Sequence, residues 1–355
     1  MSLHIFAQSL SQGECAVIFS GVSRDFLTGF RSSDGTLLVT REKQILFLDS
    51  RYFEMAQIAQ AKGEIPSHIA LKPRIFQKFF PDFAESEKIT TILFEDREMT
   101  VREFAGFKDK FPNFDYVPLG DCLEKMRRIK WVDEIEKIRD AQALAEAAYA
   151  YILPRLEVGK TELSIAAELE YFMKKNGASG PSFDTICVSG TRTSLPHGTP
   201  TDAPLEKNSF VTMDFGCKLD GYCSDMTRTV CLGKADEEMK NVYETVLLAQ
   251  ETALKTIRAG LTGKEIDASA RDVITAAGFG DFFGHSLGHG IGLKVHEAPS
   301  FSPSFDEIIP EAAVMSVEPG IYLPGKFGVR IEDLVVVRED GCENLNTSSK
   351  LLLEL

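Results

Sequence analysis

The chain reads VGKT at Val158–Thr161 and NG at Asn176–Gly177, and 101 residues later it reads AGLT at Ala259–Thr262 and AG at Ala277–Gly278. In both copies the first glycine can end a helix, the threonine two residues on can cap the next helix, and the last glycine can stop it. Because the same signals return at one offset, we predict that the second part of the chain consists of two similar halves.

Long segments with helical periodicity precede both copies of this repeat. Apolar residues recur every three or four positions in Trp131–Leu153, and Asp236–Arg258 is its counterpart before the second copy. A strand–turn–strand unit is expected after each copy. We therefore predict an α+β fold in which two α-α-β-β halves face each other, and their interface is a natural place for a binding site.

The first third of the chain has a different pattern, in which short strands alternate with helices. Strands are expected at 16–19, 36–39, 44–48 and 89–94, and a helix at 51–62. This pattern predicts a separate α/β domain. We place the boundary near residue 125, which gives domains 1–125 and 126–355.

The composition excludes several classes of protein. Among 355 residues, 39 are basic and 53 are acidic, so the net charge of -14 repels a phosphate backbone and nucleic acid is not expected as a partner. The seven cysteines include no CxxC pair, which argues against a disulfide framework and fits a reducing compartment. Neither a signal peptide nor a run of about 18 apolar residues is found, so we expect no membrane span and a cytoplasmic location.

Two acids flank a hairpin signal in the first half. Asp220-Gly221 separates two β-prone runs, and Asp214 and Asp225 lie on either side of it. We expect these acids opposite, or nearly opposite, each other on antiparallel strands, with Cβ atoms roughly 5 Å apart. Two like charges at that spacing destabilise a sheet unless a cation lies between them.

The second half repeats this arrangement. Glu318 and Glu332 flank the turn Pro324–Lys326 and are centred on Gly325. One interpretation is that the four acids lie on the solvent faces of amphipathic hairpins, since acidic residues are mostly exposed. Their symmetric placement on repeated hairpins favours metal binding.

Four of the six histidines lie in the second part of the chain, at His197, His285, His289 and His296. A single histidine is more often structural, but the last three lie together in a glycine-rich segment, within a span of twelve residues. Glycine on both sides of His289 lets the backbone approach closely and hold the imidazole at an unusual angle. Histidines that do not bind a metal can stabilise an oxyanion or orient a substrate.

Four carboxylates and one imidazole form a mainly oxygen ligand set. Such a set suits Mn²⁺, with Co²⁺ or Zn²⁺ as alternatives, better than metals that prefer thiolates. It is sufficient for two divalent ions roughly 3.5–4 Å apart that share carboxylates and a water. The chemistry that this ligand set implies is metal-assisted hydrolysis.

The same residues carry a resemblance to a known family. The ordered motifs, namely Met213-Asp214-Phe-Gly, Asp225, Gly284-His-x-x-Gly-His289-Gly, His296-Glu-x-Pro, Val-Glu318-Pro-Gly-Ile-Tyr322 and Val-Arg330-Ile-Glu332-Asp333, resemble those of the pita-bread metallopeptidases. The similarity is greatest to the branch of aminopeptidase P and prolidase and extends from about Trp131 to Leu355. The first third resembles the creatinase-like domain that precedes the catalytic domain in this branch.

This resemblance implies a role for each matched residue. The metal ligands would be Asp214, Asp225, His289, Glu318 and Glu332. Glu318 would also act as the base, while His197, His285 and His296 would bind the substrate or stabilise the tetrahedral intermediate. Arg330 and Tyr322 would support the acid cluster, and the creatinase-like domain would restrict substrate length and contribute to a homodimer.

The resemblance also implies the substrate, proline-containing peptides cut at the Xaa-Pro bond. An aminopeptidase that removes the residue before proline is the main hypothesis, and a prolidase specific for dipeptides is the alternative. A methionine aminopeptidase is disfavoured because that group lacks the first domain, and a creatine hydrolase because every metal ligand is present. A non-catalytic binding scaffold of the same fold is disfavoured for the same reason.

Overall fold

The computed structural model describes residues 2–73 and 76–355. The chain forms two compact units, Met1–Arg127 and Arg128–Leu355. The boundary between them in the sequence lies two residues after the expected one. Within the described residues, every helix is too short or too polar to cross a bilayer.

The first unit is built on a six-stranded mixed sheet with the strand order β4-β3-β2-β1-β5-β6. The central strands β3, β2 and β1 pair antiparallel, and the outer strands add in parallel. The strands are β1 (Glu14–Ile18), β2 (Thr36–Val39), β3 (Gln44–Leu48), β4 (Ala70–Pro73), β5 (Thr91–Phe94) and β6 (Asp115–Pro118). The helices are α1 (Ser2–Ser9), α2 (Gly21–Thr28), α3 (Phe53–Ala61), α4 (Phe76–Ser86), α5 (Val101–Lys110) and α6 (Cys122–Arg128).

Both faces of this sheet are buried. Along β1, Ala16 and Ile18 pack into one apolar cluster, whereas Cys15 and Val17 pack into another. The alternation follows from the period of two residues in a strand. Strands that are buried on both faces read as continuous apolar runs, which is why 36–39 and 44–48 were predictable and are confirmed.

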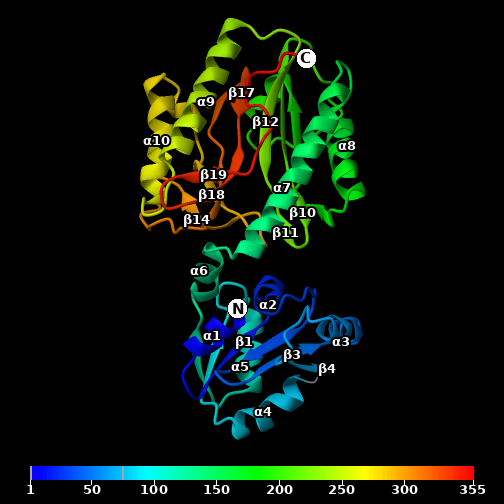
Figure 1. The fold of residues 1–355 in the computed structure, drawn as a ribbon, viewed down its shortest axis with the longest axis vertical. Coiled ribbons are helices and arrows are strands. Elements are labelled where there is room, and N and C mark those ends of the chain that lie inside the picture. Colours follow the sequence, from blue (N-terminus) through cyan, green and yellow to red (C-terminus); the bar gives the residue numbers. More distant parts are fainter. Residues whose placement is uncertain (1, 74–75) are drawn as a thin grey trace. The chain divides into compact units, whose positions relative to one another are not determined.

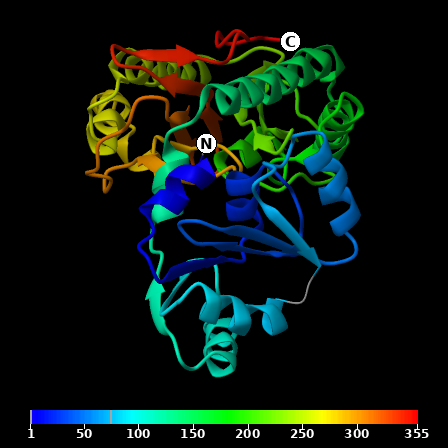
Figure 2. The ribbon, with the colours of Figure 1, turned by 60° about the horizontal axis from the view of Figure 1, so that its bottom comes forward.

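The second unit has two pairs of helices on opposite sides of its strands (Figures 1 and 2). One pair packs together in the first half and the other in the second half. The helices are α7 (Val132–Ile152), α8 (Glu162–Lys175), α9 (Glu237–Thr256) and α10 (Gly263–Ala276), with the short 3-10 helices η1 (Leu153–Arg155), η2 (Gly190–Ser194) and η3 (Gly280–Phe282).

The predicted repeat is confirmed in these helices. Thr161 caps α8 by accepting a hydrogen bond from the Ser164 backbone at 3.1 Å, and Thr262 caps α10 by accepting one from Glu265 at 3.2 Å. Both helices are 14 residues long. Identical local signals therefore set the beginning of the equivalent helix in each half.

The strands of the second unit form small antiparallel sheets between the helix pairs. Their orders are β11-β10-β7, β12-β9-β8, β14-β13-β15-β18-β19 and β16-β17. The strands of the first half are β7 (Gly180–Pro181), β8 (Ile186–Ser189), β9 (Ser209–Phe215), β10 (Cys217–Leu219), β11 (Tyr222–Cys223) and β12 (Met226–Leu232). Those of the second half are β13 (Gly288–Gly290), β14 (Glu297–Phe301), β15 (Val314–Val317), β16 (Gly320–Leu323), β17 (Phe327–Arg330), β18 (Asp333–Val337) and β19 (Cys342–Asn344).

A buried ionic network joins the two halves. Arg228 on β12 donates to the Asp333 carboxylate on β18 at 2.7 Å and to the backbone oxygen of Glu332 at 2.5 Å. Gln250 and Lys350 also donate to the Asp333 carboxylate, at 2.9 and 3.0 Å. Burial alone would raise the pKa of Asp333, but the charges of Arg228 and Lys350 outweigh it and lower this pKa.

Replacing Asp333 by alanine should destabilise the fold because Arg228 would stay buried without its counter-charge. We expect Asp333→Ala to lower the free energy of unfolding by about 3–5 kcal/mol, measured from urea unfolding curves. Asp306→Ala is a matched control, since Asp306 forms an exposed ion pair with Lys264 that contributes roughly 0–1 kcal/mol. Equal losses for the two variants would contradict a structural role for this network.

Candidate metal centre

The first hairpin carries Asp214 on β9 and Asp225 directly before β12. Asp220 and Gly221 have φ angles of 46° and 86°, the positive values that a two-residue type I′ turn requires. With this turn Asp214 lies opposite Thr227, two residues beyond Asp225. The two acids are therefore diagonal neighbours, so the prediction that they lie opposite or nearly opposite each other is confirmed.

The second hairpin places Glu318 and Glu332 opposite each other at a gap in its ladder. The pairs Val317–Asp333 and Gly320–Arg330 share one register on either side of this gap. Pro319 cannot donate a backbone hydrogen bond, which contributes to the interruption. The freed Glu332 N–H donates instead to the backbone oxygen of Thr227 at 3.1 Å, so the acid is fixed against the first half.

His289 lies on β13, between β14 and β15, where the flanking glycines allow close approach. A Cβ atom on Gly288 would lie 2.0 Å from the Ser316 backbone oxygen, and one on Gly290 would lie 2.7 Å from that of Ala298. The His289 N–H donates to the Ser316 hydroxyl at 3.0 Å. The predicted close approach of the backbone at these glycines is therefore confirmed, and the approach is to neighbouring strands.

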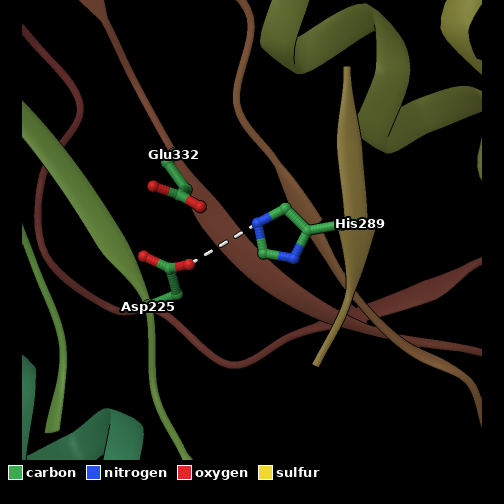
Figure 3. Close-up of side chains that lie close together, drawn as sticks. All are labelled: Asp225, His289 and Glu332. Atoms are coloured by element: carbon green, nitrogen blue, oxygen red, sulfur yellow. Dashed lines mark ion pairs between the residues drawn. The ribbon is translucent and has the colours of Figure 1, made fainter. Parts of the chain in front are cut away.

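Three of the predicted ligands form a cluster of metal-binding size. One ligand atom from each of Asp225, His289 and Glu332 lies within 4.8 Å of the others, and the three side chains converge from separate segments (Figure 3). His289 Nε2 is 3.6 Å from Asp225 Oδ2 and 3.2 Å from Glu318 Oε1. Thus four of the five predicted ligands lie in direct proximity.

The fifth predicted ligand, Asp214, lies in the same cavity and is held by Arg330. The Arg330 guanidinium donates to Asp214 at 2.5 Å, to the Tyr322 hydroxyl at 2.7 Å and to the Thr227 hydroxyl at 3.1 Å. The cavity has a volume of about 650 Å³, and all five predicted ligands line it. The predicted support of the acid cluster by Arg330 and Tyr322 corresponds to these contacts.

The other predicted histidines also line this cavity. They are His197, His285 and His296. The ring of His296 lies 4.3 Å from that of His289, and His285 Nε2 lies 2.9 Å from the Tyr322 hydroxyl. Burial lowers the pKa of both His285 and His296, so both are neutral near pH 7.

The acids of the cavity are buried with an excess of negative charge. Burial first, and neighbouring carboxylates second, raise the pKa values of Asp225 and Glu332 well above those of exposed acids. Burial would also raise the pKa of Glu318, but His289, His285 and Arg330 outweigh it and lower this pKa to about 2.

Unsatisfied oxygens identify what the cluster can bind. Asp214 Oδ1 and Glu332 Oε1 are buried and have no hydrogen-bond partner, although buried acceptors are nearly always paired. Divalent cations would supply both the missing partners and the missing positive charge. The residues present therefore fit a divalent metal site with oxygen ligands and one imidazole.

Two supporting residues escaped the sequence analysis. Thr227 donates to Glu332 at 2.7 Å and accepts from Arg330, and Ser316 donates to Glu318 at 3.1 Å while it holds the His289 backbone. Thr227 was detectable, because it lies two residues after Asp225 and strand alternation puts the two on one face. Ser316 has the same relation to Glu318.

A ligand set of four carboxylates and an imidazole, placed in one cavity between two duplicated helix–strand halves, is the arrangement of the pita-bread metallopeptidases. Residues 136–339 match the metallopeptidase family M24, and residues 11–129 match the creatinase/prolidase N-terminal domain. The chain belongs to metallopeptidase family M24.

Relatives and solved structures agree with this assignment over the full chain. An uncharacterized peptidase of Bacillus subtilis is 40% identical over 340 residues, which cover 96% of this chain and 95% of the relative. The crystal structure of an X-Pro aminopeptidase from Thermotoga maritima matches with a TM-score of 0.91 and 38% identity, covering 99% and 100% of the two chains. A Xaa-Pro dipeptidase from Bacillus anthracis matches with a TM-score of 0.93 and 35% identity, covering 100% and 99%.

Asp225→Asn should stabilise the fold in the absence of metal and weaken metal binding. A carboxyl whose pKa is raised by folding contributes stability at low pH that is lost as the pH rises through the folded pKa. After chelation at pH 8 the variant should therefore melt above the wild type, and the difference should shrink as the pH falls toward about 4. With Mn²⁺ added the order should reverse.

These melting temperatures can be compared by calorimetry, with Asp306→Asn as an exposed control that shifts neither condition. A chelated variant that melts below the wild type at pH 8 would show that the acids do not repel one another in the fold.

Proposed function

We propose that this chain is a Xaa-Pro aminopeptidase that uses two divalent metal ions, with Mn²⁺ as the physiological pair. The proposal rests on one observation: all five predicted ligands line a single cavity, and two buried oxygens among them, Asp214 Oδ1 and Glu332 Oε1, have no hydrogen-bond donor. Its similarity to an X-Pro aminopeptidase of known structure supplies the substrate class.

Each residue has a proposed role. Asp214, Asp225, His289, Glu318 and Glu332 hold the metals, which when bound lower the pKa of a water and polarise the peptide carbonyl. Glu318, placed 3.2 Å from His289 in the ligand cluster, takes the proton of the attacking water on a carboxylate oxygen.

The neutral histidines complete the chemistry. His296 can donate a ring N–H to the oxygen that becomes negative as the carbonyl is attacked. His285 donates its Nδ1–H to the Ser286 backbone oxygen, so its Nε2 accepts from the Tyr322 hydroxyl and the ring helps to shape the substrate site, while His197 orients the peptide from the cavity lining. Arg330 holds Asp214 in place through one guanidinium nitrogen. A second nitrogen of the same group donates to the Tyr322 hydroxyl, so Tyr322 helps to fix Arg330.

A dipeptidase is the second candidate, because a similar solved structure is a Xaa-Pro dipeptidase. A dipeptide presents its C-terminal carboxylate inside the site and needs a cation there. Among the described residues that line the cavity, Arg330 is the single lysine or arginine, and all three of its guanidinium nitrogens already donate to Asp214, Tyr322, Thr227 and Pro196. This favours longer peptides, whose position after proline is a neutral amide.

We further propose that the enzyme works as a homodimer in the cytoplasm. The seven cysteines are free thiols, which suits a reducing compartment. The dimer follows from the resemblance to the aminopeptidase P and prolidase branch.

A panel of three peptides tests the proposed activity. With Mn²⁺ present, Gly-Pro-Ala should be cleaved between glycine and proline with a kcat/KM at least about tenfold above that for Gly-Pro, because the dipeptide carboxylate costs on the order of 1.4 kcal/mol without a cation. Met-Ala-Ser should not be cleaved. Glu318→Gln should be folded and inactive on all three peptides.

Cleavage restricted to Gly-Pro would assign the enzyme as a dipeptidase. Release of methionine from Met-Ala-Ser at the rate seen with Gly-Pro-Ala would refute specificity for proline.

A further inference from the structure

A short segment at the rim of the catalytic cavity, Phe183–Thr185, bulges out of its sheet. On the β7 side, Ser182 donates its backbone N–H to Gly216 at 3.1 Å, and on the β8 side Ile186 lies opposite Asp214. Ile186 follows Ser182 by four residues, whereas Gly216 follows Asp214 on the partner segment by two. The two extra residues loop out, and all three residues of the segment line the cavity.

Bulges of this kind often direct side chains toward a site. The bulge is anchored at its first end, because the Ser182 hydroxyl donates to the backbone oxygen of Ser224 at 2.7 Å. Ser224 directly precedes the proposed ligand Asp225. The segment is thus fixed beside the metal ligands and is not a free surface loop.

Asp184, at the centre of the bulge, is a carboxylate without a partner. It is exposed at the cavity rim, and no hydrogen bond or ion pair reaches it from any of the described residues. Its neighbour Thr185 is 5% exposed, lines the same cavity, and its Oγ1 has no hydrogen-bond partner. The unpaired carboxylate of Asp184 and the unpaired hydroxyl of Thr185 are therefore adjacent in the chain and line the same cavity.

The charge balance of the cavity indicates what these groups bind. Two divalent ions would bind among the four ligand carboxylates, and Arg330 contacts Asp214, whereas no cation among the described residues contacts Asp184. A peptide cleaved after its first residue brings a single cation, its α-ammonium, to within one residue of the scissile bond. An ammonium with three N–H donors matches a carboxylate and a hydroxyl as acceptors.

We propose that Asp184, assisted by Thr185, binds the free α-ammonium of the substrate and so restricts cleavage to the first peptide bond. This inference rests on the proposed aminopeptidase function and names the specificity-determining residue of that same site. Because the pair is formed at a partly exposed rim, its removal should weaken productive binding about tenfold, which corresponds to about 1.4 kcal/mol.

A matched pair of ligands isolates this interaction. Gly-Pro-Ala and acetyl-Pro-Ala differ in that the second lacks the ammonium group, and the second is measured as a substrate or as a competitive inhibitor. In the Mn²⁺-loaded enzyme, Asp184→Asn should lower kcat/KM for Gly-Pro-Ala about tenfold, mainly through KM, and leave the constant for acetyl-Pro-Ala unchanged.

Two further variants separate charge from structure. Asp184→Glu should retain most of the preference for the ammonium, whereas Asp184→Ala should lose it as Asp184→Asn does. Asp202→Asn is the matched control, since Asp202 is an exposed acid outside the cavity lining, and it should leave both constants unchanged. Metal content per chain, measured for every variant, should equal that of the wild type.

The outcomes distinguish this inference from the function on which it rests. If the wild type cleaves Gly-Pro-Ala and Asp184→Asn alters the two ligands equally or not at all, Asp184 is a solvated rim acid and the inference is refuted while the function stands. A wild type that cleaves no Xaa-Pro peptide would overturn both.

Discussion

Electrostatic repulsion among four carboxylates, three of them buried, is the constraint around which the second unit is organised. Asp214, Asp225, Glu318 and Glu332 converge on one cavity, and protein cations offset only part of their charge, mainly through Arg330. The fold holds them there with antiparallel hairpins, with Thr227 between the acids of both halves, and with the buried Arg228–Asp333 pair directly beside Glu332. Such an arrangement stores unfavourable energy that divalent cations release on binding. Stability and function of this unit are therefore linked through the metal.

The duplicated architecture explains how the acids reach one another. Each half contributes one hairpin, and the interface between the halves collects both. The interruptions of the hairpins coincide with the acids: the ladder of the second hairpin opens at Glu318 and Glu332, and the Glu332 backbone bonds to the other half instead. Next to the first hairpin, the bulge at Phe183–Thr185 brings a further acid to the cavity. The hairpins thus hold metals, while the irregular segments around them determine which peptides fit.

Much of this site was predictable from the sequence because its signals are local. Short-range rules predict the Asp220-Gly221 turn, the glycines around His289 and the symmetric acids of the second hairpin. All the residues predicted for the site line one cavity except Tyr322, which contacts His285 and Arg330. The turn at Asp220-Gly221 sets the register in which Asp214 lies opposite Thr227 and diagonal to Asp225. Strand alternation could have revealed Thr227 and Ser316, whereas the bulge containing Asp184 depends on pairing between distant segments, which periodicity within one strand does not reveal. The two-sided burial of the first unit was likewise visible as apolar strands, whereas their order in the sheet was not.

The most direct test of the central claim is calorimetric titration of chelated protein with Mn²⁺ at pH 6, in two buffers that differ in ionisation enthalpy. Because the pKa values of Asp225 and Glu332 are raised, metal binding must displace protons from the cluster. The account predicts two ions bound per chain and an apparent enthalpy that changes with the buffer. Absence of binding, or binding whose enthalpy is the same in both buffers, would contradict it.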